Sequence, residues 1–158
     1  MKKLESGQTL IEVMVALAAA IAVISAIAIT VITSLQNVEY TKNQNLATQY
    51  ANEGLEIVKR IGRSNWIQLQ GYNLTNYCLA KDSTALTQRI GITCQADPLV
   101  WIYTREITID LISPSCQGNV KVASVVSWSD SKCTKDKPFC HQVGLYTCLA
   151  NINTTQAP

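Results

Sequence analysis

An uncharged apolar run near the N-terminus constrains this chain more than any other feature. Residues 13–32 contain no charged residue, no glycine and no proline. As a helix, this run would extend about 30 Å, the thickness of the hydrocarbon core of a bilayer. We therefore predict a membrane-competent helix here, and the remainder of the 158 residues is long enough for one compact domain.

The sequence after this run is polar and ordinary in composition. The formal net charge of +2 is too small to predict nucleic-acid binding. All six cysteines follow the apolar run, and an even number of cysteines in an exported segment is typical of an oxidising compartment. We therefore expect a disulfide-bonded domain outside the cytoplasm.

Glu12 stands directly before the apolar run. A carboxylate costs roughly 2.5 to 3.5 kcal/mol in the middle of a bilayer and less near its surface. A cleaved secretory signal would have an apolar core of about 7 to 15 residues, which is shorter than this run. An uncleaved signal anchor, with Lys2 and Lys3 in the cytoplasm, fits the length but leaves Glu12 unexplained.

The segment SGQTLIEV at residues 6–13 accounts for Glu12. It resembles the cleavage and methylation site of type IV prepilins and type II secretion pseudopilins, including minor pilin-like proteins. In that family a membrane aspartyl peptidase cuts after a glycine, the new N-terminus is methylated, and the fifth mature residue is glutamate. The resemblance implies cleavage between Gly7 and Gln8, methylation of Gln8, and Glu12 as the fifth mature residue.

The resemblance also implies a partner for Glu12. During assembly its carboxylate would pair with the α-amino group of Gln8 on a neighbouring subunit, with Thr9 beside this contact. Opposite charges attract strongly at low dielectric, whereas either one alone is costly to bury. The family's first mature residue is most often phenylalanine, and an N-terminal glutamine can cyclise and lose its charge. We expect a free or N-methylated amine on Gln8.

The sequence also predicts an amphipathic extension of the apolar helix. No glycine or proline occurs from Gln8 to Glu53, so we expect one helix from about Leu10 to Ile61, with Gly62 as a left-handed stop. Apolar residues recur there at steps of three or four and form a single stripe: Ala47, Ala51, Leu55, Val58 and Ile61.

Beyond this helix the apolar residues alternate with a period of two. Segments 101–112, 120–128 and 141–149 predict three antiparallel strands. A sheet laid on the apolar stripe gives an α+β architecture, which the resemblance identifies with the pilin fold. We divide the chain into a leader (1–7), a transmembrane and assembly helix (8–35), its amphipathic half (36–62), a variable connector with one short helix or strand (63–98), and a disulfide-bonded sheet region (99–158).

The predicted meander of strands limits the pairing of the cysteines. The third strand would end at the edge where the first two are joined, and one loop holds two cysteines, which leaves the last two for the connector. The expected disulfides are Cys116–Cys148, Cys133–Cys140 and Cys78–Cys94. The rival interpretation is a metal site that includes His141, but the short C-x2–4-C spacing of structural zinc sites is missing. We expect no metal and no other cofactor.

The sequence offers little support for an enzyme. His141 is the only histidine, with no obvious nucleophile or orienting carboxylate beside it. No phosphate-binding glycine loop, HExxH helix or G-x-S-x-G motif occurs. Lys132, Lys135 and Lys137 form a basic loop that is either a solvated hairpin tip or a contact for DNA, a surface or a partner pilin.

We therefore expect a structural subunit of a type IV pilus or a type II secretion-like pseudopilus. Before assembly it would be a single-pass protein of the cytoplasmic membrane, and afterwards part of an extracellular or cell-surface filament. Its partners would be other pilin subunits and the prepilin peptidase. The alternatives are a filament-tip adhesin or DNA-binding minor pilin, and a membrane-anchored extracytoplasmic metal protein or enzyme.

Overall fold

The computed structural model describes residues 5–72, 76–80, 83–89, 94 and 102–151, with side chains from Leu10 onward. The fold is α+β, and it divides into two units, Met1–Lys42 and Asn43–Pro158. Helix α1 (Glu5–Ser64) provides the first unit and the beginning of the second. The first four residues of the expected leader lie outside the described residues.

Helix α1 is unbroken, as the absence of glycine and proline predicted, but it ends later than expected. Gly62 lies inside the helix and is buried, and it does not adopt the left-handed conformation of a stop. A Cβ at position 62 would lie 3.1 Å from Leu69 Cδ2 of the short helix α2 (Trp66–Gln70). The predicted stop was therefore wrong, because this glycine makes room for α2 instead of ending α1.

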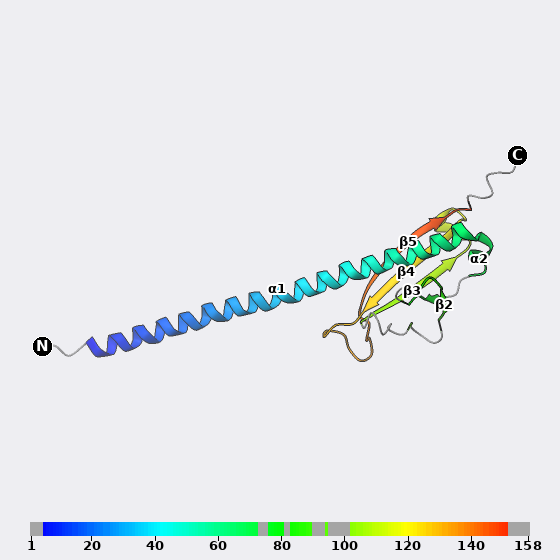
Figure 1. Cartoon of the computed structure of the whole chain (residues 1–158). Coiled ribbons are helices and arrows are strands. Elements are labelled where there is room, and N and C mark those ends of the chain that lie inside the picture. Colours follow the sequence, from blue (N-terminus) through cyan, green and yellow to red (C-terminus); the bar gives the residue numbers. More distant parts are fainter. Residues whose placement is uncertain (1–4, 73–75, 81–82, 90–93, 95–101, 152–158) are drawn as a thin grey trace. The chain divides into compact units, whose positions relative to one another are not determined.

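The second unit also contains a five-stranded antiparallel sheet (Figure 1). Its order is β2-β1-β3-β4-β5. The strands are β1 (Asn76–Cys78), β2 (Thr87–Gln88), β3 (Tyr103–Asp110), β4 (Val120–Trp128) and β5 (His141–Leu149). The meander β3-β4-β5 confirms the three predicted strands, while Trp101, at the expected start of the first, lies outside the described residues.

The connector contains more structure than the single short element predicted for it. It forms α2, β1 and β2, and β1 extends the sheet through the register pair Tyr77↔Ile107. Thr108 Oγ1 donates a hydrogen bond of 3.1 Å to Asn76 Oδ1. Strands of three and two residues are too short to show an alternating pattern, so periodicity could not reveal them.

The predicted apolar stripe of α1 packs on one face of the sheet within the second unit. Ala47 and Ala51 are fully buried and join a cluster with Tyr103, Val126 and Trp128. Farther along the helix, a second cluster combines helix and strand residues: Leu55, Val58, Leu69, Tyr77, Leu79, Leu86, Ile107, Ile109, Val120 and Val122. Burial of these apolar side chains stabilises the helix–sheet contact, which confirms the α+β architecture.

Three disulfides connect the pairs expected from the meander. They are Cys78–Cys94, Cys116–Cys148 and Cys133–Cys140, and the described residues include no free cysteine. The second pair follows from register, because Cys148 lies opposite Lys121 of β4, near the 3-10 helix η1 (Pro114–Cys116). Each bond is expected to stabilise the domain by about 2 to 4 kcal/mol.

Candidate functional site

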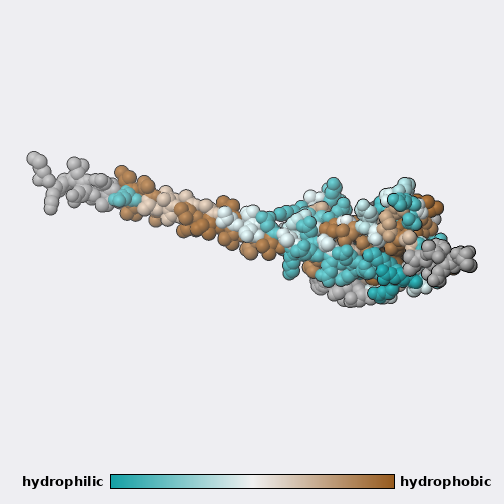
Figure 2. Space-filling view, turned by 90° about the horizontal axis from the view of Figure 1, so that it is seen from above, coloured by the Kyte–Doolittle hydropathy of each residue, from teal (hydrophilic) through white to brown (hydrophobic). Residues whose placement is uncertain are grey.

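The N-terminal part of α1 presents apolar side chains on all sides. Figure 2 shows hydrophobic residues along most of this part of the helix, with a hydrophilic patch near its start and paler or hydrophilic residues toward its end. The large apolar side chains between residues 10 and 38 are 50–66 % exposed: Leu10, Ile11, Val13, Met14, Val15, Leu17, Ile21, Val23, Ile24, Ile27, Ile29, Val31, Ile32, Leu35 and Val38. A continuous apolar surface of this kind marks contact with lipid or with apolar partners. We call it the apolar sleeve.

Among the described residues, α1 is the one helix long and apolar enough to cross a membrane. This agrees with the expectation of a membrane-competent N-terminal helix. Its position near the N-terminus is compatible with a single-pass anchor.

Three hydroxyl side chains inside the sleeve are satisfied by the helix itself. Ser25, Thr30 and Thr33 each donate a hydrogen bond of 2.8 Å to a carbonyl oxygen three or four residues earlier. A hydroxyl bonded in this way needs no water. The sleeve is therefore compatible with a dry environment as far as Thr33, whereas Ser34, Gln36 and Asn37 make its C-terminal end more polar.

Glu12 lies near the N-terminal end of the sleeve and is exposed. No other charged residue occurs between Glu12 and Glu39. Glu12 forms no ion pair with any residue whose side chain the structure describes. Gly7, Gln8 and Thr9 belong to α1, but their side chains are outside the described part. Within the described part, the acid at the head of the sleeve is thus unpaired.

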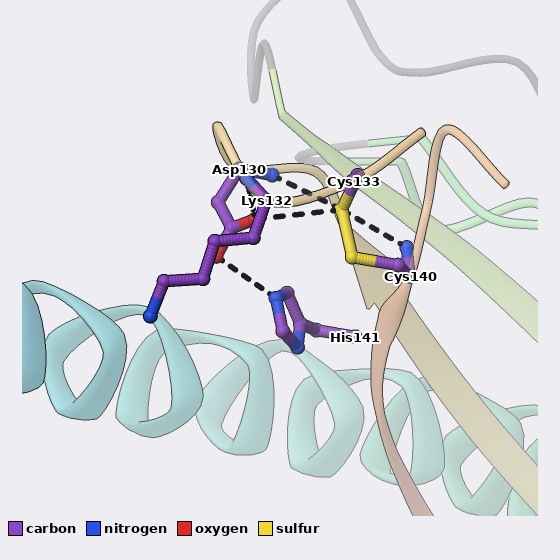
Figure 3. Close-up of polar contacts among 5 residues, drawn as sticks. All are labelled: Asp130, Lys132, Cys133, Cys140 and His141. Atoms are coloured by element: carbon purple, nitrogen blue, oxygen red, sulfur yellow. Dashed lines mark hydrogen bonds and ion pairs between the residues drawn. A yellow bond between two sulfur atoms is a disulfide. The ribbon is translucent and has the colours of Figure 1, made fainter. Parts of the chain in front are cut away.

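A second group of chemically active side chains lies in the loop between β4 and β5 and at the first residue of β5 (Figure 3). His141 Nε2 lies 2.8 Å from Asp130 Oδ2. The expectation that no orienting carboxylate lies beside His141 was therefore wrong. His141 lies opposite Trp128 in the β4–β5 register. Asp130 follows Trp128 by only two residues, so it lies near the histidine on the neighbouring strand. The Trp128 and His141 rings also stack, with centroids 5.4 Å apart.

The environment of Asp130 favours its charged form. Burial raises the pKa of the carboxyl, but two hydrogen bonds outweigh that effect and lower it overall. The donors are the Lys132 backbone N–H, 2.8 Å from Oδ1, and His141 at Oδ2. Lys132, Lys135 and Lys137 are exposed around this loop, in agreement with their expected position at a hairpin tip.

No family model, no curated protein and no solved structure matches the chain. Two features of its own chemistry remain as guides to function. The first is Glu12, an exposed acid at the head of the apolar sleeve. The second is the loop that carries Asp130 and His141, which sequence reasoning missed because the carboxylate and the histidine are eleven residues apart.

Proposed function

We propose that the chain is a structural subunit of a type IV pilus or type II secretion-like pseudopilus, a pilin-like protein assembled through α1. One observation carries the proposal. Glu12 is a lone carboxylate at the head of the apolar sleeve, and it is the fifth residue after the Gly7–Gln8 bond. Cleavage at this bond would create the cation that the carboxylate lacks.

The sleeve would serve in two environments in turn. Before assembly, its apolar side chains would lie in the hydrocarbon core of the cytoplasmic membrane. After the peptidase has removed residues 1–7, the same side chains would pack against the helices of neighbouring subunits. Lipid tails and leucine-rich helices are similarly apolar, so the transfer requires no change of surface.

The Glu12–Gln8 pair would set the register of one subunit against the next. Burial of either charge alone is strongly unfavourable, whereas the pair compensates much of the desolvation penalty. A subunit displaced along the bundle would leave both charges unpaired in a medium of low dielectric. The pair therefore selects one axial position more than it adds net stability.

The second unit supports the same proposal. A long helix with its later part packed on an antiparallel sheet is compatible with a pilin-like fold. Three disulfides suit a small domain outside the cytoplasm.

Replacement of Glu12 by glutamine tests the proposal in cells that assemble the filament. Glu12→Gln should still insert into the membrane, but it leaves the Gln8 amine of the neighbouring subunit without its carboxylate. A penalty of about 1.4 kcal/mol from this unpaired charge lowers an equilibrium tenfold, so the yield in sheared filaments should fall by about tenfold or more. Glu39→Gln is the matched control, because Glu39 is the next exposed acid on α1, and it should assemble normally. Normal assembly of Glu12→Gln would refute the proposed pair.

A binding role at the filament tip is a second candidate, based on the exposed lysines Lys132, Lys135 and Lys137. Three cations at one loop can attract phosphate groups. Their replacement by glutamate should abolish binding to DNA or to a surface and leave filament formation intact. Unchanged binding would exclude this role for the loop.

A further inference from the structure

The β4–β5 loop and the first residue of β5 bring together four potential metal ligands from a short stretch of chain. One ligand atom from each of Asp130, Cys133, Cys140 and His141 lies within 4.8 Å of the others (Figure 3). The set comprises one carboxylate oxygen, one imidazole nitrogen and two sulfurs. Oxygen, nitrogen and sulfur ligands of these types bind Zn²⁺ in four-coordinate tetrahedral sites.

The backbone of this loop already solvates one of the two sulfurs. Cys133 Sγ accepts hydrogen bonds from the N–H of Asp130 at 3.4 Å and from the N–H of Cys140 at 3.3 Å. A disulfide sulfur is a weak acceptor, whereas a thiolate carries a full negative charge and gains much more from such donors. The two N–H donors favour a thiolate at Cys133, whereas the Asp130 carboxylate, whose Oδ1 lies 3.5 Å from the same sulfur, opposes it. A cation between the two negative groups would remove this repulsion.

The imidazole is also held in position. Its ring stacks on the buried Trp128 side chain, and its Nε2 is oriented by Asp130. When a ligand side chain is already held in position, metal binding loses less conformational entropy in ordering it. A metal ion would take the place of the hydrogen between His141 and Asp130.

We propose that reduction of the Cys133–Cys140 disulfide converts this loop into a zinc site with Asp130, Cys133, Cys140 and His141 as ligands. In the oxidised protein the two sulfurs are bonded to each other and the site is closed. The site does not depend on filament assembly, so it stands or falls separately from the function proposed above.

The reductant is a dithiol, and the reaction balances in three steps. A thiolate of the dithiol attacks Cys140 Sγ, forms a mixed disulfide and releases Cys133 as a thiolate. The second thiol of the reductant then displaces Cys140, and the reductant becomes a cyclic disulfide. Zn²⁺ binds the two protein thiolates, and the two protons of the dithiol pass to the solvent.

Access favours reduction of this bond over Cys78–Cys94. Cys140 is exposed, whereas Cys94 is only 3 % exposed and its partner Cys78 is half-buried. In the third disulfide Cys116 is 4 % exposed, but Cys148 is exposed like Cys140. Thiol–disulfide exchange requires the attacking thiolate to reach a sulfur. A soluble dithiol should therefore open Cys133–Cys140 before Cys78–Cys94, and a variant that lacks Cys133 and Cys140 is needed to separate this site from thiols released at Cys116 and Cys148.

The test is metal binding by the full chain in detergent, before and after treatment with dithiothreitol and its removal under anaerobic conditions. The reduced protein should bind one Zn²⁺ per chain, and Co²⁺ in its place should give thiolate charge-transfer bands and the absorption of a tetrahedral site. The oxidised protein should bind neither ion. Circular dichroism establishes that each sample is folded.

Three variants make the result specific. Cys133→Ser/Cys140→Ser, reduced in parallel, should bind no Zn²⁺, which separates this site from thiols released elsewhere. His141→Ala should weaken Zn²⁺ binding by about tenfold or more, while Lys135→Ala, in the same loop, should bind like the wild type. Absence of stoichiometric Zn²⁺ binding by the folded, reduced wild type, or undiminished affinity in either ligand variant, would overturn the proposal.

Discussion

Gly54 of α1 lies directly against Ser124 of β4. A Cβ at position 54 would lie 2.6 Å from Ser124 Oγ and 2.9 Å from Ile107 Cδ1. Contacts this short do not occur at real Cβ atoms, so the helix reaches this distance from the sheet because position 54 has no side chain. Ser124 Oγ is buried and has no hydrogen-bond partner among the described residues.

Gly54→Ala is expected to destabilise the second unit although alanine favours helices. Alanine gains about 1 kcal/mol of helix propensity over glycine, whereas overpacking costs about 1 to 3 kcal/mol. The steric effect should exceed the propensity gain, and the free energy of unfolding should fall by about 1 kcal/mol. Chemical denaturation of the full chain in detergent measures this change.

Two variants separate the steric effect from other effects of the substitution. A Cβ at Gly144 of β5 would meet no atom closer than 3.6 Å, so Gly144→Ala should be neutral or slightly stabilising. Ser124→Ala in the Gly54→Ala background removes the oxygen nearest to the new methyl group and should recover part of the loss. A stabilised Gly54→Ala protein would show that the helix does not approach the sheet this closely.

Arg105 attaches the connector to the sheet. Its side chain is only 8 % exposed, and it donates to Leu79 O at 3.1 Å and to Ala80 O at 2.7 Å. Arg105→Met should reduce the free energy of unfolding by about 2 to 3 kcal/mol, because it removes charged donors from backbone carbonyls. Thermal and chemical unfolding would both register the loss.

Arg89→Met is the control for Arg105→Met, because it removes an arginine that forms an ion pair with a carboxylate. Arg89 lies 2.7 Å from Glu106, and both side chains are partly exposed. A pair of this kind contributes up to about 1 kcal/mol. Equal losses in the Arg89 and Arg105 variants would contradict the importance of the Arg105 backbone contacts.

The long elements of this fold could be predicted from sequence because each repeats its pattern several times. The stripe of Ala47, Ala51, Leu55 and Val58 follows the helical period, and the buried positions of β4 follow a period of two. Both patterns reflect burial of one face, which is local information in the sequence. The disulfide pairs followed from the order of the strands.

Other features depend on contacts between distant residues, and local patterns could not predict them. The role of Gly62 depends on Leu69 of α2, which folds back against it. The Asp130–His141 contact depends on the β4–β5 register and on the return of the loop. Glu12 differs from both cases, because its apparent lack of a partner is visible in sequence while its proposed partner belongs to another molecule.

The contribution of Asp130 to stability should depend on pH. Its pKa is lowered in the folded protein, so the stabilisation is complete above the ordinary carboxyl pKa of about 3.9 and is lost as pH falls through the lower folded pKa. Asp130→Asn should therefore be less stable than the wild type at pH 7, and the difference should shrink below about pH 4. Chemical denaturation at several pH values measures the difference. A difference independent of pH would contradict the electrostatic role.

The intact mass of the chain, after co-expression with a prepilin peptidase, tests the central claim most directly. We predict a protein that begins at Gln8, with a free or N-methylated amine that can pair with Glu12, and Gly7→Val should block this processing. Retention of Met1 to Gly7 in the wild type would contradict the prepilin assignment. Cleavage followed by cyclisation of Gln8 to pyroglutamate would contradict the ion pair on which assembly is proposed to depend.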